Sequence, residues 1–115
     1  MLKGHEAWKA LGRKKAGVMN KTEALYAEQL DRLKCSGDVL WWEFEGAKFK
    51  LANLTFYTPD FIVHHSDMVV RLHEVKGSFI QDKALTKVKI AAEKYPFEFL
   101  VMQYAKKTWT CIAKY

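Results

Sequence analysis

Three residues with side chains suited to phosphodiester chemistry lie near the two ends of one short stretch, Tyr57–Gly77. Asp60 follows a proline at the start of a first apolar run. After thirteen further residues, Glu74 and Lys76 close a second run on either side of Val75. Side chains alternate along a strand, so Glu74 and Lys76 should share one face. If the two runs pair as a β-hairpin, Asp60 returns to the end that carries Glu74, and two carboxylates and an ammonium group meet there.

Such a cluster suits hydrolysis of a phosphodiester, which needs an activated water and stabilisation of a highly charged transition state. Mg²⁺, or Mn²⁺ in its place, supplies both when hard oxygen ligands hold it. We expect Asp60 and Glu74 to bind the metal through their carboxylates and Val75 through its backbone carbonyl. Lys76 would orient the attacking water or stabilise developing negative charge. The alternative is a surface hairpin with an ordinary Glu-Lys pair, because E-x-K alone is common.

A helix is predicted over Asn20–Lys34. Asn20 is a good N-cap, and Glu23 three residues later completes a capping-box pattern. One side of the helix forms an apolar stripe of Tyr26, Leu30 and Leu33. Glu23 lies at the edge of this stripe. It either only caps the helix or, turned toward the core, also joins the acidic cluster as a further catalytic or metal-binding carboxylate.

The rest of the chain predicts strands and a second helix around one sheet. Strands are expected where aromatic and β-branched residues gather between turn signals, and the helix where apolar residues recur at helical spacing before Pro96. The expected strands are 39–45, 48–51, 61–63, 68–76, 97–104 and 108–113, and the expected helix is about 82–94. Residues 64–67 would form the hairpin turn, and 53–58 a connection into the hairpin. The order α-β-β-β-β-α-β-β predicts an α/β or α+β fold, a mixed central sheet flanked by helices.

The charge balance favours a polyanionic partner. Nineteen Lys and Arg against thirteen Asp and Glu give a net charge of +6, and the pI is near 9.3. Neutralising phosphates releases counterions, so a basic domain gains affinity for DNA of any sequence. Lys83 and Lys87, on the polar side of the second helix, are either DNA contacts or a solvated face. The same two alternatives hold for Arg13, Lys14 and Lys15 in a basic N-terminal arm over residues 1–19, which precedes a single domain over 20–115.

Other classes of protein fit the sequence less well. No apolar run approaches the roughly 20 residues that span a bilayer, so a soluble, cytoplasmic protein without a membrane partner is expected. Cys35 and Cys111 are expected to be buried, reduced thiols. His64, His65 and His73 suggest a rival transition-metal site or general base. Adjacent strand residues face opposite ways, however, and no Cys/His spacing typical of zinc is present.

Four segments carry a resemblance to a known family: TEALYAEQL at 22–30, YTPDF at 57–61, HEVKG at 73–77 and AAEKYPF at 91–97. The chain from about Asn20 to Phe99 resembles the PD-(D/E)-x-K nuclease superfamily. More closely, it is similar to a family of small, largely uncharacterised bacteriophage proteins within it. The resemblance implies a restriction-endonuclease-like fold.

The resemblance also implies roles for single residues. Asp60 and Glu74 match the superfamily's metal-binding carboxylates, Lys76 its catalytic lysine, and Glu23 the acidic residue that many members carry on the first helix. Lys83 or Lys87 lies where some members place a further polar residue.

We therefore expect a Mg²⁺-dependent DNA endonuclease acting in phage recombination, repair or processing, in the cytoplasm of a bacterial host. Its DNA would be duplex or branched. A Holliday junction resolvase, working as a two-fold homodimer, is the leading specific version. The alternative is a non-catalytic nucleic-acid-binding module on the same fold.

Overall fold

Helix α2 (Lys21–Ser36) opens the part of the chain that the structure, a computed structural model, describes: residues 17–115. The predicted capping box is present, since the Asn20 side chain accepts a hydrogen bond from the Glu23 N–H and Glu23 Oε1 accepts one from the Asn20 N–H. Gly37 ends the helix at φ 90°, a left-handed conformation that glycine adopts without strain. The predicted first helix is thus confirmed, extended by two residues.

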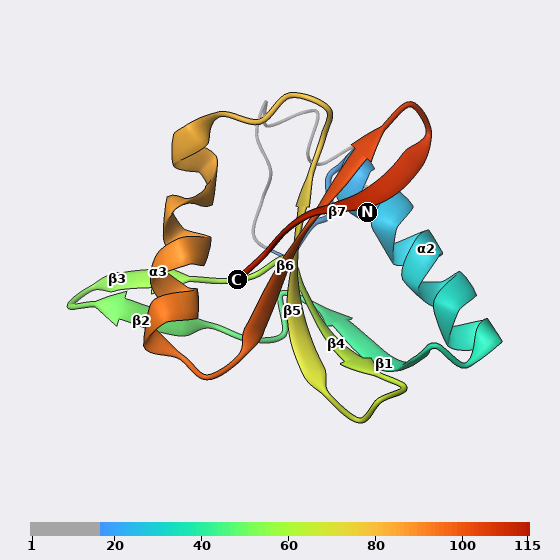
Figure 1. The fold of residues 1–115 in the computed structure, drawn as a ribbon, viewed down its shortest axis with the longest axis horizontal. Coiled ribbons are helices and arrows are strands. Elements are labelled where there is room, and N and C mark those ends of the chain that lie inside the picture. The colour runs from blue at the N-terminus through green and yellow to red at the C-terminus, as the bar shows by residue number, and fades with distance from the viewer. Residues whose placement is uncertain (1–16) are drawn as a thin grey trace.

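Five strands form one mixed sheet (Figure 1). In chain order they are β1 (Val39–Phe44), β4 (Phe61–His65), β5 (Val70–Lys76), β6 (Glu98–Ala105) and β7 (Thr108–Lys114). They lie side by side in that same order, and of these pairs only β5–β6 is parallel. A parallel pair needs a crossover, which the 3-10 turn η1 (Asp82–Leu85) and helix α3 (Thr86–Lys94) supply. The α+β class with a mixed sheet flanked by helices is confirmed.

A small hairpin adds one strand to the predicted order. Strand β2 (Phe49–Ala52) pairs antiparallel with β3 (Thr55–Tyr57) in a sheet of its own, where the sequence predicted only a connection over 53–58. The order is α-β-β-β-β-β-α-β-β. The reason is local: Thr, Phe and Tyr favour extended backbone, and the turn between the strands holds Leu54 at φ 57°.

The turn of the central hairpin also differs from the prediction. Both His64 and His65 belong to β4, and the turn follows at 66–69. Asp67 explains the shift, because its carboxylate accepts a hydrogen bond from the Val69 N–H at 3.0 Å and pairs with Arg71 at 2.7 Å. The turn is therefore built around Asp67, and the two histidines stay in the strand.

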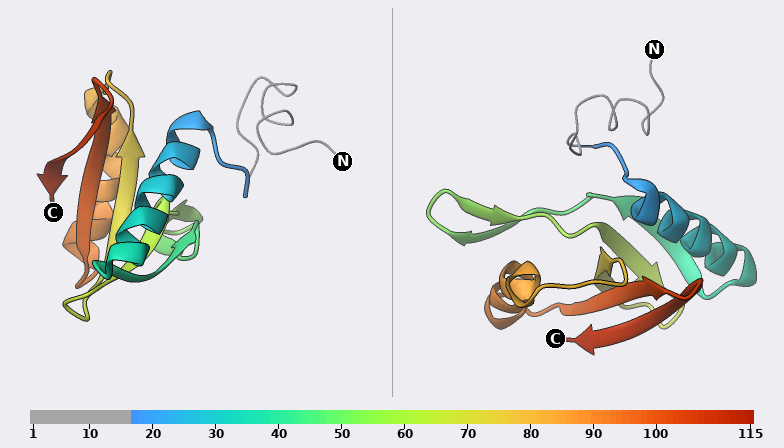
Figure 2. Two further views of the ribbon diagram at one scale, coloured as in Figure 1. Left: turned by 90° about the vertical axis from the view of Figure 1, so that its right-hand side faces the viewer. Right: turned by 90° about the horizontal axis from the view of Figure 1, so that it is seen from above.

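The two helices cover opposite faces of the sheet (Figure 2). Under α2 lies a buried cluster of Tyr26, Leu30, Val39, Phe61, Val63 and Val75. Under α3 and the β2–β3 hairpin lies a second cluster of Leu51, Tyr57, Leu72, Val88, Ala91, Phe99 and Val101. Leu72 and Val75 of β5 therefore pack in different clusters, because side chains alternate between the two faces along a strand.

The two cysteines are unpaired but exposed, so the prediction that they are buried is wrong. Cys35 lies in the last turn of α2, away from the stripe that Tyr26 and Leu30 bury. Cys111 lies on β7, at the edge of the sheet. Within residues 17–115, no helix is both long and apolar enough to cross a bilayer.

Candidate active site

The antiparallel register of β4 and β5 brings the start of one strand to the end of the other. Phe61 pairs with His73, so Asp60, one residue before β4, lies beside the end of β5. The Val75 N–H donates a hydrogen bond of 2.8 Å to Asp60 Oδ2. Asp60 and Glu74 are both buried. The structure thus brings together the two carboxylates that the hairpin pattern predicted to converge.

Glu74 is held by a hydrogen bond on one carboxylate oxygen and by an ion pair on the other. The Tyr57 hydroxyl donates to Oε1 at 2.6 Å, and Lys76 Nζ lies 2.9 Å from Oε2. Tyr57 ends β3 and packs in the cluster beneath α3, so Glu74 and Lys76 point to that face of the sheet. The predicted shared face of Glu74 and Lys76 is therefore correct.

Glu23 reaches the same place from α2. It is 4% exposed, caps the helix through the Asn20 N–H, and lies beside Asp60, whose pKa its charge raises. Of the two alternatives left open by the sequence, the second describes its position: Glu23 caps the helix and also lies next to the acidic pair.

Burial and mutual repulsion dominate the electrostatics of this cluster. Burial first, then the charges of Glu74 and Glu23, raise the pKa of Asp60 well above its ordinary range, while the Val75 N–H acts against the rise. Burial and the neighbouring Glu74 likewise raise the pKa of Tyr57, which keeps its hydroxyl a donor. Carboxylates that repel one another in this way are relieved by a cation placed between them.

The backbone of Val75 faces the acidic pair, although its side chain does not. The side chain is buried in the cluster under α2. In a strand, the N–H and C=O of one residue point toward the same side. Because the Val75 N–H points to Asp60, its carbonyl oxygen points to that side as well.

These oxygens suit a hard divalent cation better than a transition metal. Mg²⁺ typically binds one or two carboxylates and keeps several waters. Asp60, Glu74 and the Val75 carbonyl form such a donor set. No group of three or more His, Cys, Asp or Glu side chains in residues 17–115 is arranged as a metal cage. A divalent cation here would therefore need water to complete its shell beside Asp60, Glu74 and the Val75 carbonyl.

The lysines predicted to contact DNA lie apart from this cluster. Lys83 is exposed in η1, on the connection that follows β5. Lys87 is exposed on α3, where its Nζ donates a 3.0 Å hydrogen bond to the Phe56 carbonyl and so ties the helix to the β2–β3 hairpin. Arg13, Lys14 and Lys15, with nearly all of the predicted arm, lie outside the described residues.

The histidines form a separate buried chain on the face under α2. The Tyr26 hydroxyl lies 2.6 Å from His73 Nδ1, and His73 Nε2 lies 2.9 Å from His65 Nε2. Burial lowers the pKa of His73 to about 3, so this imidazole is neutral. If the Tyr26 hydroxyl donates to His73 Nδ1, then the His73 Nε2–H donates to His65 Nε2. The imidazole rings of His73 and His65 are then both hydrogen-bonded within this chain.

Sequence reasoning missed Tyr57 as a member of the site. Its contact with Glu74 spans seventeen positions and depends on β3, which was not predicted. The available signal was its place just before Pro59-Asp60, at the end of an aromatic, β-prone segment.

No known protein family, curated protein or solved structure matches the chain, so the functional argument depends on the geometry of this site.

Proposed function

We propose that this protein is a Mg²⁺-dependent DNA endonuclease of the PD-(D/E)-x-K type. The observation that carries the proposal is the convergence of Asp60, Glu74 and Lys76 at the open end of the β4–β5 hairpin. Two buried carboxylates lie beside a peptide group and an ammonium group there. This combination meets the needs of phosphodiester hydrolysis, namely hard oxygen ligands for a cation and a positive group for the developing charge.

The chain's own residues would share the work. Asp60, Glu74 and the Val75 carbonyl would hold Mg²⁺, which supplies Lewis-acid stabilisation of the scissile phosphate when bound. Lys76, already oriented by Glu74, would position the attacking water or stabilise charge on the phosphate. Glu23, which caps α2 and lies beside Asp60, would be a further carboxylate at the site.

Basic side chains on the α3 face provide a path for the phosphate backbone. Glu74 and Lys76 point to the face covered by α3 and the β2–β3 hairpin. Five exposed lysines lie on that hairpin and on η1–α3: Lys50, Lys83, Lys87, Lys89 and Lys94. Contacts of this kind bind duplex DNA without reading its sequence. A resolvase acting as a two-fold dimer on branched DNA is the narrower form of the proposal.

The test is cleavage of plasmid, linear and four-way-junction DNA by the purified protein with Mg²⁺, with Mn²⁺ and with EDTA. Asp60→Asn and Lys76→Ala should each reduce cleavage at least about 100-fold. Glu28→Gln and Lys34→Ala, exposed positions on α2, are matched controls and should cut as the wild type does. The proposal fails if no substrate is cut, or if the two site variants remain fully active.

A non-catalytic nucleic-acid-binding module is the second candidate. One observation favours it: both Glu74 oxygens already have protein partners, Tyr57 and Lys76. This candidate predicts DNA binding that weakens steeply with salt but no metal-dependent cleavage. Calorimetric titration with Mn²⁺ separates the two, because only the enzyme requires a metal site that is lost in Glu74→Ala.

A further inference from the structure

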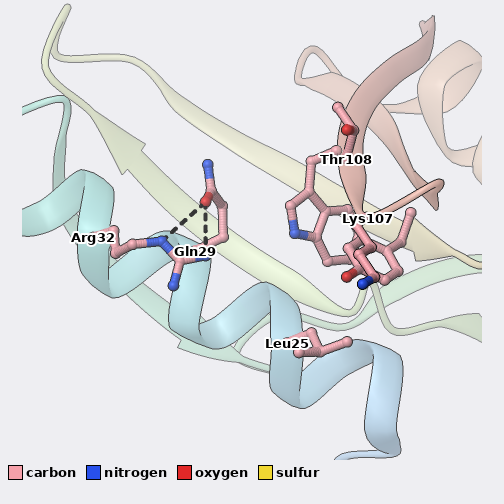
Figure 3. A pocket seen from close by; sticks show the side chains of 7 residues that line it. Leu25, Gln29, Arg32, Lys107 and Thr108 are labelled. Atoms are coloured by element: carbon pink, nitrogen blue, oxygen red, sulfur yellow. Dashed lines mark hydrogen bonds between the residues drawn. The ribbon is translucent and has the colours of Figure 1, made fainter.

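A pocket of about 350 Å³ lies between α2 and the β6–β7 hairpin, apart from the acidic cluster. Figure 3 shows Gln29 and Arg32 projecting from α2 on one side, and Lys107 and Thr108 on the hairpin opposite. Trp109 and Tyr104 also line it. The volume lies in the range of pockets that bind small molecules or single residues of a polymer.

The aromatic wall of the pocket is held rigidly from behind. The Trp109 ring packs edge-on against Tyr26, with the ring centroids 4.7 Å apart, and in a tilted arrangement against Tyr104 at the same separation. Tyr26 is buried, whereas Trp109 keeps part of its surface accessible. An indole fixed between two other rings loses little freedom when a flat ligand stacks on it.

The rest of the lining is positive and polar. Arg32 and Lys107 are both exposed, and no acidic residue within 17–115 lines the pocket. The Arg32 Nε and Nη2 donate to Gln29 Oε1 at 3.3 and 3.0 Å, which fixes the guanidinium while leaving other N–H donors for a ligand. An aromatic surface beside two cations and an amide is the chemistry that recognises a nucleotide: a flat base carrying a phosphate.

We propose that this pocket binds one unpaired nucleotide of a DNA single strand. The base stacks on Trp109, and Arg32 and Lys107 bind the phosphate. A paired base cannot reach an aromatic side chain in this way, because it is already stacked within its duplex. That the polymer is DNA rests on the proposed function; the pocket chemistry stands without it.

The position of the pocket relative to the acidic cluster indicates how a bound single strand would help to place a branched DNA. The pocket opens on the α2 side of the molecule, whereas the lysines of the hairpin and α3 lie on the other face of the sheet. The acidic cluster takes Glu23 from the first side and Glu74 from the second. A branched DNA with its duplex on the α3 face and an unpaired strand on the α2 face would place the branch at the acidic cluster.

Binding is measured by fluorescence anisotropy in EDTA, so that it does not depend on metal or cleavage. The probes are a labelled oligothymidylate of about twelve nucleotides and a duplex of equal length, each in moderate salt. Lys107→Asn and Arg32→Gln should weaken binding of the single strand about tenfold and leave duplex binding nearly unchanged. Asparagine is chosen because Lys107 has φ 59°, which asparagine tolerates.

The matched control for the hairpin is Lys106→Asn. Lys106 is the neighbouring turn lysine, also left-handed at φ 52°, and it does not line the pocket. Lys34→Gln is the control for α2. Trp109→Leu, checked by its thermal melt, should match Lys107→Asn. Equal losses in Lys107→Asn and Lys106→Asn, or equal losses for single strand and duplex, would overturn the proposal.

A competition arm identifies the ligand's source. Free thymidine monophosphate should displace the labelled strand only at concentrations far above those of unlabelled oligothymidylate, because neighbouring nucleotides add contacts. If the mononucleotide competes as well as the strand, the pocket is a free-nucleotide site and the single-strand assignment is wrong. If the wild-type protein binds the single strand but cuts no DNA, the proposed function is contradicted and the proposal for this pocket is not.

Discussion

Tyr57 shows how one hydroxyl can decide the geometry of a proposed metal ligand. It donates a 2.6 Å hydrogen bond to Glu74 Oε1, while Lys76 holds the other oxygen. The Glu74 carboxylate therefore has its orientation set before any cation binds. Groups that orient a ligand in this way contribute to metal affinity without touching the metal.

Tyr57→Phe should raise the Mg²⁺ concentration for half-maximal cleavage about 10- to 100-fold, because Glu74 loses its orienting donor while the ring stays in the core. The measurement is the cleavage rate across a Mg²⁺ titration. Tyr95→Phe is the control: its hydroxyl also donates a 2.6 Å hydrogen bond, but to the Lys50 carbonyl. An unchanged Mg²⁺ dependence in Tyr57→Phe would show that the hydroxyl has no positioning role.

Asp60 should make the metal-free protein less stable as the pH rises. Its pKa is raised by burial and by Glu74 and Glu23, so the folded state binds a proton that the unfolded state has already released above about pH 4. Stability is therefore lost as the pH climbs toward the folded pKa. In EDTA at pH 8, Asp60→Asn should melt about 5 °C above wild type, with a smaller difference at pH 5.

Mg²⁺ should reverse this ranking in part, since a cation that binds only the folded wild type stabilises it. Thermal melts with and without Mg²⁺ at pH 8 provide the check. A melting point of Asp60→Asn at or below that of wild type in EDTA would contradict the expected repulsion.

At the scale of elements, local signals predicted α2, β1 and the helical crossover. Helix caps, β-prone residues and apolar periodicity each depend only on residues that are close together in the sequence. The convergence of Asp60 and Glu74 also followed from one hairpin. Strand β3 was missed because its three residues are too few for a clear pattern, although its partner β2 was predicted. The sequence offered Glu23 only as one of two alternatives and did not predict the contact of Tyr57, since both contacts depend on how separate elements pack.

The histidine chain ties α2 to β4 and β5 and should make this packing sensitive to acid. His73 is neutral when folded because burial lowers its pKa to about 3, whereas an unfolded histidine titrates near 6.5. The unfolded state therefore binds more protons below that pH, and stability is lost as the pH falls from about 6.5 toward 3.

Urea midpoints at pH 7 and pH 4.5 should thus differ more for wild type than for His73→Gln, which has no imidazole to protonate. His64→Gln, on the same hairpin, is the control and should retain the wild-type difference. An identical pH dependence in wild type and His73→Gln would remove the buried chain as its cause.

At the scale of the whole molecule, the net charge of +6 predicts binding to DNA that weakens with salt. Where the charge lies matters more than its sum. The hairpin and η1–α3 carry lysines on the face toward which Glu74 and Lys76 point, and Lys87 also fastens the two elements together.

Lys87→Gln should weaken duplex binding and reduce the slope of log affinity against log salt by about one, as expected for the loss of one phosphate contact. Lys34→Gln, which removes the same charge from the far helix, should leave the slope unchanged. Equal slopes for wild type and Lys87→Gln would place the duplex elsewhere on the surface.

The parallel pairing of β5 with β6 has a consequence for folding while the chain is being synthesised. Strand β5, which carries Glu74 and Lys76, is central in the sheet, yet one of its two neighbours is synthesised only after η1 and α3. Pairings between distant segments form late, because the intervening chain must be closed first. A ribosome-bound chain that stops before residue 98 therefore has its acidic residues but only one side of the strand that positions them. The proposed cutting activity would begin only when nearly the whole domain has emerged.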